Sequence, residues 1–79
     1  MSPTIYRERG YRFFFFSREE ARLHVHVVCA EGEAKYWLEP DVSLASQCKL
    51  DLRQLRDIQA IIEVHRNEFI AAWHTHFPG

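Results

Sequence analysis

The chain has 79 residues, of which 47% are hydrophobic and 27% are charged. This length suits one domain, and the composition is that of a folded chain and not of a disordered one. Ten Lys and Arg against eleven Asp and Glu give a formal net charge of −1, which excludes the overall basic charge typical of domains that bind nucleic acid through its phosphates. We therefore expect a single folded domain over residues 1–79.

The first part of the chain, residues 1–49, is predicted to form mostly strands. A short strand at residues 5–7 is followed by Gly10 and by the aromatic run Tyr11–Phe16, which has high strand propensity. Residues 41–49 have a looser apolar pattern that fits either a short edge strand or an irregular crossing segment.

A hairpin is predicted from residues 23–29 and 33–39, because the first of these segments alternates in polarity and a turn sequence separates the two. A two-residue turn at Glu31 and Gly32 makes one face of the hairpin wholly apolar. The apolar pairs are then Val25 with Leu38, Val27 with Tyr36 and Cys29 with Ala34. The pairs on the other face are His24 with Glu39, His26 with Trp37 and Val28 with Lys35.

The second part of the chain is predicted to be one long helix over residues 50–77. Asp51 and Gln54 have the spacing of a capping box, and Pro78 with Gly79 ends the helix. One apolar stripe follows the helical period: Leu55, Ile58, Ile61, Ile62, His65, Phe69, Ala72, Trp73 and His76. The sequence thus predicts an α+β fold, a small and mostly antiparallel sheet of three to five strands packed against one long C-terminal helix.

Two histidines of the hairpin, His24 and His26, are the candidate catalytic residues. They lie two positions apart on one face, and Glu39 would add a carboxylate from the neighbouring strand, as in two-histidine, one-carboxylate metal sites. The alternative is a half-exposed pair that hydrogen-bonds to Glu39 and packs beside Trp37. We expect no bound cofactor and no divalent metal, because histidines on an open hairpin lack the partners that orient metal ligands. His65 is expected to be a core residue with one hydrogen-bond partner.

The aromatic run places phenylalanines on both faces of one strand, whereas a single helix covers only one face of a sheet. The uncovered face therefore either binds a partner or is covered by Trp37 and residues 41–49. We expect a partner, which is a second copy of the chain or another protein. The candidate partner-binding residues are Arg12, Phe14, Phe16, Lys35 and Trp37. The alternative is a base-stacking surface for RNA, with Arg7, Arg12, Arg22 and Lys35 at the phosphates.

Charged residues near the N-terminus and the short apolar runs, Phe13–Phe16 and Phe69–Trp73, predict neither a secretory signal nor a membrane span of about 20 residues. We expect a cytoplasmic protein with no membrane partner. Cys29 and Cys48 do not form a Cys-x-x-Cys pair and are expected to be free thiols.

Specific segments of the chain also resemble a small bacterial family, the domain of unknown function 4160. The segments are Pro3-Thr4, Gly10–Phe13, Phe15–Ser17, His24–Val27, Gly32–Pro40, His65-Arg66 and Ala72-Trp73. The resemblance implies a gene that lies beside that of another small protein, in an arrangement like that of toxin–antitoxin pairs. We therefore expect a protein-binding component of such a two-gene module. The alternative is a minimal metal-dependent or acid-base hydrolase that acts on RNA.

Overall fold

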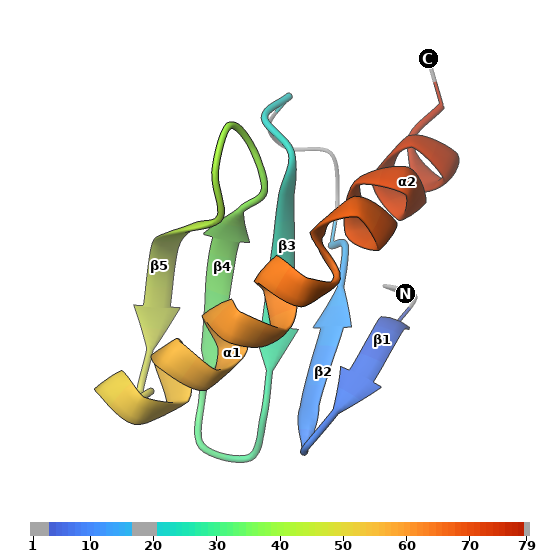
Figure 1. The fold of residues 1–79 in the computed structure, drawn as a ribbon. Coiled ribbons are helices and arrows are strands. Elements are labelled where there is room, and N and C mark those ends of the chain that lie inside the picture. Colours follow the sequence, from blue (N-terminus) through green and yellow to red (C-terminus); the bar gives the residue numbers. More distant parts are fainter. Residues whose placement is uncertain (1–3, 17–20, 79) are drawn as a thin grey trace.

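The computed structural model describes residues 4–16 and 21–78, which form a five-stranded antiparallel sheet with two helices on one of its faces (Figure 1). The strands are β1 (Thr4–Glu8), β2 (Tyr11–Phe14), β3 (His24–Val28), β4 (Glu33–Trp37) and β5 (Ser43–Cys48). The helices are α1 (Leu52–Val64) and α2 (Arg66–His76). Each strand pairs with the next in the chain, so the spatial order is β1-β2-β3-β4-β5. The predicted α+β class is confirmed.

A tight turn at Arg9 and Gly10 connects β1 to β2. Both residues have positive φ, 53° and 84°, and Glu8 pairs with Tyr11 on either side of them. Two successive positive φ angles are typical of the two-residue hairpin turn whose twist matches that of the strands, and glycine adopts such an angle without strain.

The hairpin of β3 and β4 has the predicted faces in a different register. Val25 pairs with Tyr36 and Val27 with Ala34, so every pair is shifted by two residues from the prediction. The Cys29 N–H donates to the Gly32 carbonyl at 2.9 Å, which places Ala30 and Glu31 in the turn in place of Glu31 and Gly32. Because side chains alternate with period two, this shift moves no residue to the other face.

This register also changes the cross-strand pairs on the polar face of the hairpin. The observed pairs are His24 with Trp37, His26 with Lys35 and Val28 with Glu33. The predicted pairing of His24 with Glu39 is therefore wrong, because Glu39 lies beyond the end of β4.

Residues 43–48 form a regular edge strand, β5, which decides between the two predicted alternatives for this segment. It pairs with β4, and its register shifts at Ala45, between the pairs Lys35–Ser46 and Tyr36–Leu44. Because β5 extends the sheet sideways, it covers neither face of β2. Cys48 at its end is exposed, Cys29 is half-buried, and both are free thiols.

The predicted long helix is two helices in the structure. The capping box is present: the Gln54 N–H donates to the Asp51 carboxylate at 2.8 Å, and the Asp51 N–H donates to the Gln54 side chain at 3.1 Å. His65 ends α1 with ψ of 13°, far from the helical value of about −42°, although its N–H still bonds to the Ile61 carbonyl. Neither described helix has the length and apolar composition of a membrane span.

The core lies between the helices and one face of the sheet, and its buried residues come from both layers. The largest fully buried hydrophobic residues are Phe13, Phe15, Val25, Val27, Tyr36, Leu38, Ile58, Ile62 and Trp73. The predicted helical stripe is thus mostly confirmed, but two of its histidines are not core residues. His65 is half-buried at the break between the helices, and His76 is exposed at the end of α2.

Candidate functional site

The face of the sheet that neither described helix covers, called here the helix-free face, carries side chains of alternate residues in β2, β3 and β4. Phe13 and Phe15 point into the core and are fully buried, whereas Phe14 is half-buried and Phe16 is 62% exposed. The aromatic run is therefore divided between the two faces, as the alternation predicted.

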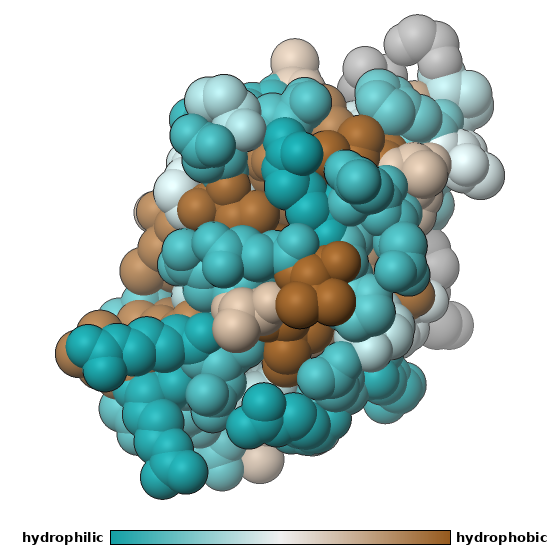
Figure 2. Space-filling model, viewed as in Figure 1, coloured by the Kyte–Doolittle hydropathy of each residue, from teal (hydrophilic) through white to brown (hydrophobic). Residues whose placement is uncertain are grey.

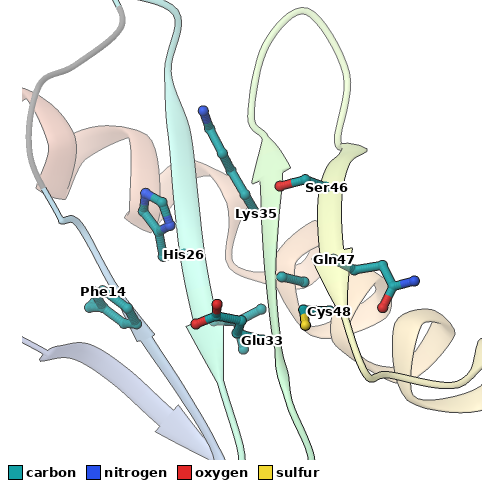
Figure 3. Close-up of a pocket in the computed structure, with 9 residues that line it drawn as sticks. Phe14, His26, Glu33, Lys35, Ser46, Gln47 and Cys48 are labelled. Atoms are coloured by element: carbon teal, nitrogen blue, oxygen red, sulfur yellow. The ribbon is translucent and has the colours of Figure 1, made fainter.

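Strand pairing places a row of side chains across the helix-free face. Phe14 pairs with His26, His26 with Lys35, and Lys35 with Ser46, so the row crosses β2, β3, β4 and β5. Figure 3 shows these side chains one after another, with the helices behind the sheet. The rings of Phe14 and His26 are stacked with their centroids 5.5 Å apart, and the Phe16 ring meets His26 edge-on at 6.1 Å.

Cationic groups lie on the aromatic rings of this face. The Arg12 guanidinium is 4.7 Å from the centre of the Phe14 ring. The Arg22 guanidinium and the Lys35 ammonium are 4.3 and 4.7 Å from the Trp37 ring. These distances are those of cation–π interactions, which fix the positions of long charged side chains on the sheet surface.

A pocket of about 240 Å³ opens on the helix-free face over β3, β4 and β5 (Figure 3). Its lining residues are Phe14, His26, Val27, Glu33, Ala34, Lys35, Ser46, Gln47 and Cys48. Pockets that enclose drug-sized molecules typically measure about 300–1,000 Å³. This pocket therefore suits one inserted side chain better than a complete small molecule.

His24 contacts residues of both the helix-free face and α2. The prediction that it is half-exposed is wrong. It is fully buried, with its ring 5.9 Å from Trp37 on the helix-free face and 5.0 Å from Trp73 of α2. The pairs of β2 with β3 end at Phe14 and His26, so His24 has no partner on β2, and Trp73 packs against it.

The hydrogen bond of His24 fixes its tautomer. Its Nδ1 lies 2.8 Å from the Arg22 carbonyl oxygen, which can only accept, so Nδ1 carries a proton, and in the neutral ring the lone pair is on Nε2. Among the described residues, this buried Nε2 has no hydrogen-bond partner. The sequence predicted that no neighbouring group orients the rings of the hairpin histidines. This is wrong for His24, because the Arg22 carbonyl orients its ring.

The predicted set of His24, His26 and Glu39 is only partly brought together. The two histidine rings are in edge-on contact at 5.2 Å. Glu39 is exposed after the end of β4, and its carbonyl accepts a hydrogen bond from Arg22 Nε at 3.0 Å. The described part of the chain contains no group of three or more His, Cys, Asp or Glu side chains that could hold a metal ion.

His65 lies away from this site, on the helix-covered side. Its Nδ1 is 3.0 Å from the Glu68 carboxylate, its Nε2 is 3.7 Å from that of Glu8, and its ring contacts Tyr6 at 4.3 Å. The half-buried histidine at the helix break thus has a side-chain partner, as the sequence predicted.

The comparison with known protein families places the chain in one of them. The family described as a domain of unknown function (DUF4160) matches residues 10–74, which is nearly the whole chain. The chain belongs to this family. No curated protein and no solved structure matches it. The matched residues include the strands and rings of the helix-free face, so this face is part of the family domain and not an appendage to it.

Arg22 and Ser46 also contribute to the helix-free face, although the sequence alone does not identify them as partner-binding residues. Arg22 lies on Trp37, and its position two residues before His24 in an alternating segment is a signal that could have placed it there. Ser46 belongs to the segment whose structure the sequence left open, so no pattern could have placed it opposite Lys35.

Proposed function

We propose that this chain is a protein-binding component of a bacterial two-gene, toxin–antitoxin-like module, and that its helix-free face binds the protein encoded by the neighbouring gene in the cytoplasm. The observation that carries the proposal is the group of aromatic rings, Phe14, Phe16 and Trp37, on the face that the helices leave uncovered. Aromatic residues and arginine are enriched at protein interfaces, where they account for much of the binding energy.

Three observations favour a protein over RNA as the partner. Base stacking requires open ring faces, but Arg12 already lies on Phe14, and Arg22 and Lys35 lie on Trp37. The net charge of −1 also gives no general attraction to phosphates. The pocket beside Phe14 fits a single side chain, which supports a protein partner with one anchoring residue.

The test is to co-express the chain with the product of the adjacent gene, purify the complex and measure its affinity by calorimetry. Phe16→Ala is the informative variant, because Phe16 is exposed and its loss leaves the core intact. We expect the dissociation constant to rise about tenfold or more. Val64→Ala is the matched control, since Val64 is 78% exposed on α1, and it should leave the affinity unchanged.

Three outcomes would contradict this function. The first is that the co-expressed proteins do not associate. The second is that Val64→Ala weakens the complex as much as Phe16→Ala does. The third is an oligouridylate that binds the purified chain and loses affinity in Phe16→Ala, which would identify the face as an RNA surface.

The alternative function, a hydrolase acting on RNA, is favoured by one observation: the ring of His24 is oriented by the Arg22 carbonyl and is in edge-on contact with the ring of His26. Elemental analysis of protein purified without chelator tests it, together with an assay of RNA cleavage. We expect no stoichiometric metal and no cleavage. Stoichiometric zinc or manganese that is lost in the double variant His24→Ala, His26→Ala, with the fold preserved, would support the hydrolase.

A further inference from the structure

The two edges of the sheet differ in how they are protected from pairing with another strand. The edge strand β1 contains charged residues at Arg7 and Glu8, a common protection of open edges. The opposite edge, β5, has the sequence Ser-Leu-Ala-Ser-Gln-Cys, with neither a charge nor a proline. One side of β5 pairs with β4, and no described strand pairs with its other side. An uncharged open strand of this kind is a ready surface for strand addition.

Apolar side chains are exposed next to this edge. Leu44 in β5 is 42% exposed and Leu52 in the first turn of α1 is 63% exposed. Figure 2 shows apolar surface along the left margin of the molecule, where β5 and the start of α1 lie in Figure 1. A strand added to β5 would remove part of this surface from water, which stabilises the pair by about 25 cal/mol per Å² of apolar area.

Charges at the two ends of β5 select the orientation of the added strand. Asp41 precedes β5 and Lys49 follows it, and both are exposed. If two copies of the chain pair antiparallel about a two-fold axis, Asp41 of each copy comes to the end of the strand where Lys49 of the other lies. The ends of the strand are thus self-complementary, which is the requirement for a two-fold interface.

We propose that a second copy of this chain adds to β5 in an antiparallel arrangement and joins the two sheets into one. The irregularity at Ala45 divides β5 into two short runs, Ser43–Leu44 and Ser46–Cys48. The antiparallel arrangement pairs the first run of one copy with the second run of the other. This interface uses an edge of the sheet and leaves the helix-free face open, so it is independent of the proposed function.

The test is sedimentation of the full chain at micromolar concentrations, with charge exchange at the two ends of β5. We expect a dimer. Asp41→Lys and Lys49→Asp should each raise its dissociation constant about tenfold, since each replaces two opposite-charge contacts with two like-charge contacts. The mixture of the two variants should form a heterodimer, and the double variant should dimerise as the unchanged chain does. Arg7→Glu, a charge reversal on β1, is the matched control and should have no effect.

A monomer at all concentrations up to 200 μM, with the fold confirmed by circular dichroism, would overturn the inference. A dimer that persists in Ser46→Lys, which places a charge in the middle of the paired strand, would also overturn it. A third outcome would overturn it as well: Asp41→Lys and Lys49→Asp each weaken the dimer, but a mixture of the two variants forms no heterodimer. Loss of the dimer in Phe16→Ala but not in Ser46→Lys would assign self-association to the helix-free face instead.

Discussion

The two faces of the sheet carry similar residues in opposite environments. Phe13 and Phe15 are fully buried beneath the helices, whereas Phe14 and Phe16, their neighbours in the chain, lie on the helix-free face, where both contact His26 and Arg12 lies on Phe14. Hydrophobicity alone thus does not decide burial in this domain. The period of the strand divides the aromatic residues into two sets, and the helices decide which set becomes core.

The same contrast exists between the two tryptophans. Trp73 of α2 is 1% exposed and contacts Phe15 and His24, whereas Trp37 of β4 is half-buried beneath Arg22 and Lys35. One tryptophan fills the core and the other forms part of the proposed binding surface. Substitutions on the two faces test this division of roles.

Trp73→Ala should reduce the free energy of unfolding by about 3–5 kcal/mol, because it leaves a large cavity in the core. Trp37→Ala should cost less than about 2 kcal/mol and should weaken partner binding instead. Urea denaturation of both variants measures the difference. If Trp37→Ala proves as destabilising as Trp73→Ala, the helix-free face is a structural surface and the contrast between the faces is wrong.

Val27→Asn and Val28→Asn compare neighbouring valines on opposite faces. Val27 is buried, so an amide there loses apolar contacts and hydrogen bonds to water, at a cost of about 3 kcal/mol. Val28 is half-buried on the helix-free side, and its replacement should cost about 1 kcal/mol or less. Thermal melts followed by circular dichroism give the ranking, and a reversed order would mean that the faces of β3 are inverted.

Tyr36 makes the helix-covered face sensitive to alkaline pH. Burial raises the pKa of Tyr36 from 10.0 to about 12, and its hydroxyl donates to the Leu55 carbonyl at 2.9 Å. Because the folded state favours the protonated phenol, its stabilising effect is complete below pH 10 and is lost as the pH rises toward 12. Tyr36→Phe should cost about 1 kcal/mol at neutral pH and should reduce the loss of stability in this alkaline range.

Absorbance titration of tyrosinate, together with melts from pH 8 to pH 12, measures both effects. A Tyr36→Phe variant whose alkaline stability loss equals that of the unchanged chain would show that another group is responsible.

His24→Phe tests the residue at which the faces meet, and we expect the smallest effect there, a change below about 1 kcal/mol. The variant loses the bond from Nδ1 to the Arg22 carbonyl, but it also removes a buried Nε2 that has no hydrogen-bond partner among the described residues. Replacement of a buried polar group by an apolar one of similar shape is often nearly neutral. A loss of several kcal/mol in urea denaturation would indicate that Nε2 has an essential partner.

Local patterns in the sequence were enough to predict the faces of the strands and the start of the helices. Alternation assigned Val25 and Val27 to the core and His26 to the opposite face, and the spacing of Asp51 and Gln54 predicted the capping box. Each of these features depends on residues that are close in the chain, so its signal is complete within a short window. The candidate partner-binding residues are on one face for the same reason.

Tertiary structure decided the features that depend on distant residues or on a choice between equivalent patterns. A shift of two residues leaves the faces of the β3–β4 hairpin unchanged, so the pattern could not distinguish the predicted register from the observed one. His24 is buried among the rings of His26, Trp37 and Trp73, and Trp73 is far from it in the chain, so no local pattern predicts this burial. The helix break at His65 leaves the apolar stripe intact, so periodicity could not reveal it. The break lies in the backbone angles of one residue, and no side-chain pattern records them.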